Sequence, residues 1–69
     1  MSTVVVDPEI FWGAPVFRGT RVPVDTLMEY LTNGDSLESF LSDFPSVSRQ
    51  VAIAFLEEGA QRVVQAAAS

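Results

Sequence analysis

Apolar positions change their period near Val24, and this change divides the chain into a β part and a helical part. Before it, the β-branched run at 3–6 ends in an Asp-Pro pair, which predicts a short strand. After it, apolar residues recur every three or four positions, the spacing of one face of a helix. The pattern therefore predicts one domain, with a β element over 1–24 and a helical bundle with a C-terminal helical tail over 24–69.

Two local features are predicted within the β element. Residues 8–15 are expected to form one helical turn between two prolines, with Phe11 and Trp12 as buried anchors. Residues 15–24 are expected to form a β-hairpin about Gly19, which suits the first central position of a type II′ turn.

Three helices are predicted after the β element. The first ends at Gly34 in the C′ position, and the second begins after the cap Ser36 and ends before Pro45. The third begins after the cap Ser48. Gly59 either ends this helix or is a weak interior position, and continuation or a kink is expected because the residues after it include strong helix formers. The apolar stripes are Val24, Leu27, Met28 and Leu31 in the first helix, Leu37, Phe40, Leu41 and Phe44 in the second, and Val51, Phe55 and Leu56 in the third. Helices of about 9 to 15 residues with short links predict a mostly α fold, a three-helix bundle with the outline of a helix-turn-helix and a small N-terminal β-hairpin.

Composition predicts an associating protein. The chain has 69 residues, of which 48% are apolar, and it contains no Cys and no His. Disulfides are therefore excluded, only carboxylates remain for a metal, and a chain this short gains stability most readily by association. A homodimer is expected, through either the apolar stripe of the tail at 62–69 or the N-terminal strand. Neither a membrane span nor a signal peptide is recognisable, so a cytoplasmic location is expected.

The available side chains speak against catalysis. The chain lacks His, Cys and Lys, and with them the usual general base, thiol nucleophile and Schiff-base amine. Asp35 and Glu38 are placed to favour the positive end of the second helix, and Asp43 lies off its apolar stripe. No enzymatic activity, cofactor or metal is therefore expected.

Arg18 and Arg21 flank a Gly-Thr pair and supply half of the positive charges of a chain whose net charge is −5. Thr20 and Arg21 have an ordinary explanation as turn chemistry and as solvation of an edge strand. The functional alternatives are that the arginines contact DNA phosphates or pair with acidic residues of a partner. The net charge itself opposes tight DNA binding by the isolated chain.

Ser46, Ser48, Arg49 and Gln50 stand where a helix-turn-helix presents side chains to the major groove. The alternative is that Ser48 only caps the helix and Arg49 only solvates it. The helix continues with apolar residues and two acids, so a long base-reading face is not expected.

Residues 13–57 resemble the domain of unknown function 433 family, which shares a G-x-P-x-x-x-G-T-R hairpin followed by two short helices. The matching residues are Gly13, Pro15, Gly19, Thr20, Arg21, Pro23, Gly34, Phe40, Phe44, Pro45 and Val51. The resemblance implies a homeodomain-like helix-turn-helix preceded by a small β element. It also implies the antitoxin of a type II toxin–antitoxin pair whose toxin is a PIN-like nuclease, with repression of its own operon by the complex bound to operator DNA.

PIN-like nucleases hold metals with clustered carboxylates, so an inserted guanidinium from Arg18 or Arg21 could neutralise such a site. The second interpretation, from another class, is a protein-interaction or scaffolding module that has the helix-turn-helix shape and no DNA role.

Overall fold

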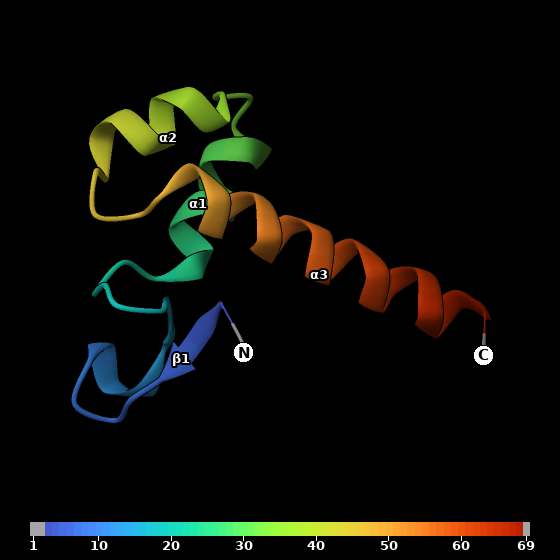
Figure 1. Ribbon diagram of the computed structural model, residues 1–69, viewed down its shortest axis with the longest axis horizontal. Helices are drawn as coiled ribbons and strands as arrows, with labels where there is room; N and C mark the ends of the chain where they lie inside the picture. Colours follow the sequence, from blue (N-terminus) through green and yellow to red (C-terminus); the bar gives the residue numbers. More distant parts are fainter. Residues whose placement is uncertain (1–2, 69) are drawn as a thin grey trace.

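Two short strands and three α-helices follow one another along the chain in the computed structural model, which describes residues 3–68 apart from the side chains of residues 11 and 68. The elements are β1 (Val4–Val6), a 3-10 turn η1 (Phe11–Gly13), β2 (Pro15–Phe17), α1 (Val24–Thr32), α2 (Leu37–Asp43) and α3 (Arg49–Ala68) (Figure 1). The predicted mostly α fold with a small N-terminal β element is confirmed. No helix in this described part is long and apolar enough to cross a membrane.

The β element pairs differently from the prediction. β1 runs antiparallel to β2, with Val5 opposite Val16, so the N-terminal strand is the partner of β2. The expected pairing across Gly19 is reduced to an isolated bridge between Val16 and Pro23. The physical reason lies in the chain after the turn, because Pro23 has no N–H to donate and the next residue already begins α1.

The turn between β2 and α1 is also of another type. The Thr20 N–H donates to the Phe17 carbonyl at 3.0 Å, so Arg18 and Gly19 are its central residues. Gly19 has φ of +77° at the second central position, which a type II turn requires. The predicted type II′ turn, with glycine first, is therefore wrong.

The C-terminal end of α1 has the predicted glycine stop. Gly34 has φ of +87°, its N–H donates to the Leu31 carbonyl, and the Asp35 N–H donates to the Tyr30 carbonyl. This pair of hydrogen bonds is the Schellman motif, in which a residue without a Cβ occupies the left-handed region.

Serine caps begin the other two helices, as predicted. Ser36 Oγ accepts a hydrogen bond from the Ser39 N–H, and Ser48 Oγ accepts one from the Val51 N–H, each at 3.1 Å. The helix lengths differ from the expected range, because α2 has seven residues and α3 has 20. α3 is long because it continues through Gly59, as predicted.

The hydrophobic core joins β2 to all three helices. Its buried residues are Phe17, Val24, Leu27, Phe40, Val47 and Ala52. Phe17 lies at the centre, with its ring centroid 6.1 Å from that of Phe40 and 5.3 Å, edge to face, from that of Phe55. Val47, before the cap Ser48, and Ala52, in the first turn of α3, are both buried, which is the placement of a hydrophobic staple.

Two predicted apolar positions are exposed. Trp12, expected to be an anchor, is 95% exposed, and Met28 on the α1 stripe is 40% exposed. The Phe11 side chain, the other expected anchor, lies outside the described residues. Phe17 is the aromatic residue of the β element that fills the core instead.

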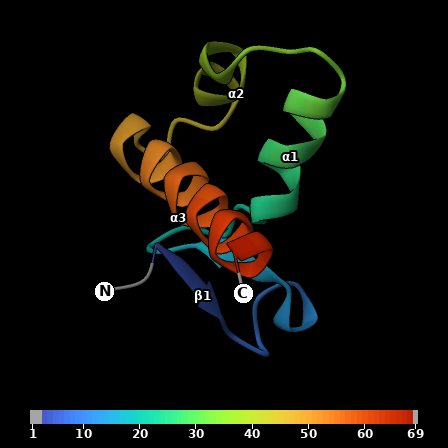
Figure 2. The same ribbon diagram turned by 90° about the vertical axis from the view of Figure 1, so that its right-hand side faces the viewer.

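The C-terminal half of α3 extends away from the rest of the molecule, and the C-terminal end lies far from α2 (Figure 1). Viewed along α3, α1 and α2 lie on one side of this helix and β1 on the other (Figure 2). The first turns of α3 therefore belong to the core, and its last turns form a surface of their own.

Candidate functional site

The side chain of Thr20 holds the turn before α1 together. Its hydroxyl donates to the Phe17 carbonyl at 2.8 Å and accepts from the Val22 N–H at 3.1 Å. Both hydrogen bonds are internal to 17–22, so the turn-chemistry explanation holds for this hydroxyl. By fixing the backbone on either side of it, Thr20 sets the position from which Arg21 projects.

An open hollow brings three of the predicted site residues together. Thr20 and Arg21 from the turn and Ser46 from the link between α2 and α3 line it together with aliphatic side chains of the β element. The complete lining is Val5, Ile10, Val16, Gly19, Thr20, Arg21 and Ser46. We call this the Arg21–Ser46 hollow. Arg21 and Ser46 thus line the same hollow, although 25 positions of the chain separate them.

Trp12 borders a second hollow, which Arg21 also lines. Pro8, Glu9, Trp12 and Arg21 line it. Trp12 has φ of 54° and ψ of 33°, a left-handed conformation that costs a residue with a Cβ about 1 to 2 kcal/mol. We call Trp12 and Arg21, with these two adjoining hollows, the Trp12 surface.

Backbone hydrogen bonds fix the loop that carries Trp12. The Ile10 N–H donates to the Asp7 carbonyl at 2.9 Å, and the Gly13 N–H donates to the Ile10 carbonyl at 3.1 Å. Asp7 also accepts the Glu9 N–H on its side chain, at 2.9 Å. The exposed indole of Trp12 is thus carried, in a left-handed backbone conformation, by a loop with internal hydrogen bonds.

Arg18 occupies the first central position of the turn and is exposed. Its backbone N–H donates to the Thr3 carbonyl at 2.8 Å, which extends the pairing of β1 with β2 by one residue. Arg18 lines neither of the two hollows that Arg21 borders.

The predicted residues at the start of α3 have separate roles. Ser48 is the cap, Arg49 forms an ion pair with Glu38 of α2, and Gln50 is exposed. Further along the helix, the exposed Ile53 and Glu57 follow. This part of α3 thus presents an ion-paired arginine, one amide, an aliphatic residue and an acid. Such a series does not make a long polar face for reading bases.

The acids around α2 make contacts with neighbouring side chains. The Tyr30 hydroxyl of α1 donates to Asp43 Oδ2 at 2.6 Å, which joins α1 to the end of α2. This hydrogen bond, with smaller contributions from desolvation and from the negative charge of Asp43, raises the pKa of Tyr30 above its usual value. Among the residues the structure describes, no three acidic side chains lie close enough together to hold a metal ion.

The C-terminal half of α3 forms a second group of exposed residues. Val63 and Val64 are 69% and 66% exposed. An apolar groove lies between α1 and α3, lined by Met28, Phe55, Leu56, Gly59, Ala60 and Val63.

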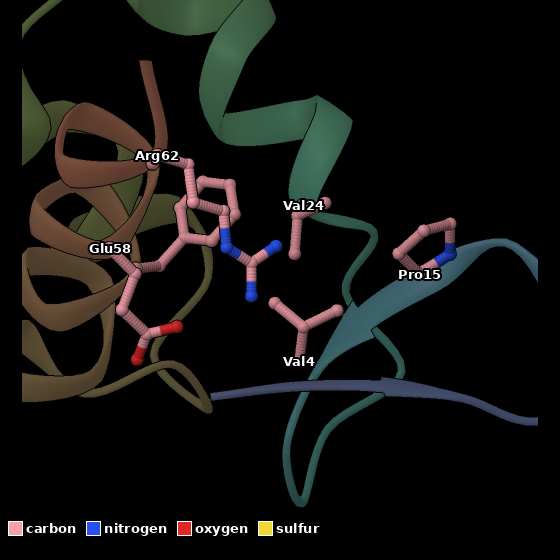
Figure 3. A pocket seen from close by; sticks show the side chains of 7 residues that line it. Val4, Pro15, Val24, Glu58 and Arg62 are labelled. Carbon is pink, nitrogen blue, oxygen red and sulfur yellow. The ribbon is translucent and has the colours of Figure 1, made fainter. Parts of the chain in front are cut away.

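On the other side of α3, a cleft separates this helix from the β element. The Arg62 side chain extends toward Val4 and Val24, and Glu58 lies one helical turn before it (Figure 3). The Thr3 hydroxyl donates to Glu58 Oε2 at 3.5 Å across the same cleft. A hydrogen bond therefore connects this side of the helix to the β element.

Comparison with known proteins places the sequence in a family. The family model described as "Protein of unknown function (DUF433)" matches residues 4–57. The chain belongs to the DUF433 family. The match includes the whole Trp12 surface and ends within α3, before Arg62 and Val63.

Two further similarities support the DUF433 assignment. The chain is 40% identical over 47 residues to the uncharacterized protein y4eO of Sinorhizobium fredii, an alignment that covers 68% of this chain and 21% of that protein. The chain thus spans about a fifth of the length of this relative. The crystal structure of a DUF433 member protein from Anabaena variabilis matches with a TM-score of 0.67 and 22% identity, over 100% of this chain and 71% of that one. The fold is shared along the full described length, including the extended end of α3.

Sequence reasoning missed the exposure of Trp12. A signal was present, because the single tryptophan of the chain lies between Pro8 and Gly13, in a segment too short to bury an indole within itself. The neighbourhood of Arg21 and Ser46 carried no local signal, because only the folded core brings the turn to the link between α2 and α3.

Proposed function

We propose that this chain is an antitoxin that binds a PIN-like nuclease and silences it through the Trp12 surface. The observation that carries the proposal is the 95% exposure of Trp12 in a strained, ordered loop beside Arg21. Tryptophan and arginine are the residues most enriched among those that dominate protein–protein binding energy. The family resemblance supplies the class of partner.

The proposed contact has an apolar part and a charged part. Burying the indole of Trp12 removes up to about 150 to 250 Å² of side-chain surface from water. The guanidinium of Arg21 then forms bidentate, charge-assisted hydrogen bonds with carboxylates of the nuclease, of the kind that hold catalytic metals. Occupying these carboxylates would displace the metal or the substrate, so inhibition would need no chemistry from this chain. We assign it no catalytic role, and we place its action in the cytoplasm, where such a nuclease meets its substrate.

Co-expression tests this function. The proposal predicts a small PIN-like nuclease gene next to the gene for this chain; its product is made in a bacterial host, alone and with the chain, and growth is followed. The wild-type chain should restore growth. Trp12→Ala and Arg21→Ala should each weaken binding of the purified nuclease by about 30-fold or more, the effect of losing a dominant contact residue. Ser42→Ala, at an exposed position of α2, serves as the control and should bind normally.

Absence of any nuclease gene next to this chain, or full inhibition by Trp12→Ala, would contradict the proposal. If Trp12→Ala and Arg21→Ala both bind an identified partner that is not a nuclease as the wild-type chain does, the scaffolding module is favoured instead. Circular dichroism of each variant distinguishes a lost contact from a lost fold.

DNA binding enters the proposal only for the complex. The short link between α2 and α3 and the exposed Gln50 at the start of α3 are compatible with entry of this helix into a groove. The net charge of −5 and the pairing of Arg49 with Glu38 leave little attraction for phosphates, so a cationic partner has to supply it.

A further inference from the structure

We propose that the Arg21–Ser46 hollow recognises a short acidic segment of the partner, in which an aliphatic side chain adjoins a carboxylate. The proposal rests on the protein-binding function above and names the chemistry of the recognised segment. The evidence is the combination of an aliphatic lining with one cationic side chain at the border.

The apolar half of the proposed recognition comes from the β element. Val5 lies on β1, Val16 lies opposite it on β2, and Ile10 belongs to the loop between the strands. These three side chains surround an open depression beside the turn. An aliphatic side chain of a partner would leave water on entering it, which is worth about 25 cal/mol for each Å² buried.

The charged half comes from Arg21, which borders both hollows of the Trp12 surface. The whole chain has nine carboxylates against four arginines, and two of these four, Arg18 and Arg21, are in this turn. An acidic segment is therefore attracted to this turn more than to the rest of the molecule, which attracts basic segments. Charge complementarity favours a carboxylate next to the aliphatic side chain.

Ser46 supplies a hydroxyl from the link between α2 and α3, and it is exposed. Because Ser46 is exposed, a substitution at this position can fill the hollow without disturbing the core. A large side chain at 46 would occupy the space that the partner residue needs. The equivalent change at Ser42, also exposed but on α2, adds the same bulk elsewhere.

A peptide titration tests the recognised chemistry on the chain alone. The ¹⁵N-labelled protein is titrated with acetyl-Ala-Leu-Asp-Ala-amide, and amide shifts are followed. Signals of Gly19, Thr20, Arg21 and Ser46 should move together. Replacing the leucine of the peptide by alanine, or its aspartate by asparagine, should weaken binding at least tenfold. Equal shifts with all three peptides, or no shift at these four amides, would overturn the proposal.

A variant pair tests it in the complex. Ser46→Tyr should weaken binding of the nuclease at least tenfold, and Ser42→Tyr should leave it unchanged, with both variants melting as the parent does. Normal binding by folded Ser46→Tyr would overturn the hollow as a recognition site while leaving the antitoxin function intact. Conversely, selective peptide binding by a chain that fails to rescue growth would support the hollow and contradict the antitoxin function.

Discussion

The hydroxyl of Thr20 donates a hydrogen bond to the Phe17 carbonyl at 2.8 Å, and it accepts one from the Val22 N–H at 3.1 Å. Phe17 is fully buried at the centre of the core. This one side chain therefore connects the core to the turn that carries Arg18 and Arg21. Of the residues in the Gly-Thr-Arg sequence, threonine serves the fold and arginine is available for contact.

Thr20→Val should destabilise the protein by about 1 to 3 kcal/mol, because it removes the hydroxyl that donates to one part-buried backbone group and accepts from another. Thr20→Ser keeps the hydroxyl and should lose less. Urea unfolding followed by circular dichroism gives both values. Equal stability of the valine and serine variants would show that the hydroxyl is dispensable.

The glycine at the end of α1 should resist substitution. Gly34→Ala places a Cβ at φ of +87° and should cost about 1 kcal/mol, even though no atom lies within 4 Å of the added carbon. Gly59→Ala is the matched control, since it also meets open space but lies within α3. It should stabilise by about 0.5 to 1 kcal/mol. Opposite signs in thermal unfolding are expected, and a stabilised Gly34→Ala would contradict the Schellman geometry.

Tyr30 should titrate above its ordinary pKa of 10.0, because its hydroxyl donates to Asp43. The folded state then retains a proton that the unfolded state releases, so folding stability from this contact is complete below pH 10 and is lost as pH rises through the raised pKa. The chain contains one tyrosine, so phenolate absorbance reports it directly.

Asp43→Ala removes the acceptor and should bring the Tyr30 titration back toward its usual range. Glu9→Ala, in the loop before β2, changes charge by the same amount far along the chain and should not. A Tyr30 titration unaltered by Asp43→Ala would contradict the hydrogen bond as the cause.

Self-association through α3 stays a prediction. If the exposed Val63 and Val64 form the contact between two copies, sedimentation velocity should detect a dimer whose population rises with concentration. Val63→Glu should then yield monomers, while Gln65→Glu, at an exposed position that is not three or four residues from either valine, should not. A monomer at all concentrations for the wild-type chain would contradict the expected homodimer.

Binding to operator DNA gives a further prediction. The chain alone should not shift a fragment of its own promoter at physiological salt, because its net charge repels the phosphate backbone. The complex with the nuclease should shift it, and the shift should weaken as salt is raised. A tight shift by the isolated chain would contradict the account of Arg49 as paired with Glu38.

Local sequence signals predicted most of the helical fold. The caps Ser36 and Ser48 and the stop at Gly34 act within a few residues of their own backbone partners, so the sequence around them was sufficient. Strand pairing was harder to predict, because the strand that contains Val16 has two possible partners, the N-terminal strand and the residues after Gly19. The proline at 23 shortens the second pairing, and the choice depended on it.

The candidate site was predictable in part. The sequence indicates Thr20, Arg21 and Ser46 as candidate site residues, but for different reasons, and nothing local indicates that they line one hollow. Hydrophobicity alone predicts a core position for Trp12. Its left-handed backbone, followed by Gly13 at φ of +87°, turns the indole outward, and such a backbone is not encoded by a periodic pattern.

The most direct measurement of the central claim is the fluorescence of Trp12, the chain's single tryptophan, during titration with a variant of the PIN-like nuclease that contains no tryptophan. In the isolated chain the indole should emit as a water-exposed group and be quenched by iodide. At saturation its emission should move to shorter wavelength and its quenching should fall several-fold, and Arg21→Ala should shift the titration midpoint upward by about 30-fold. A complex in which Trp12 keeps its exposed emission and its full quenching would contradict the account.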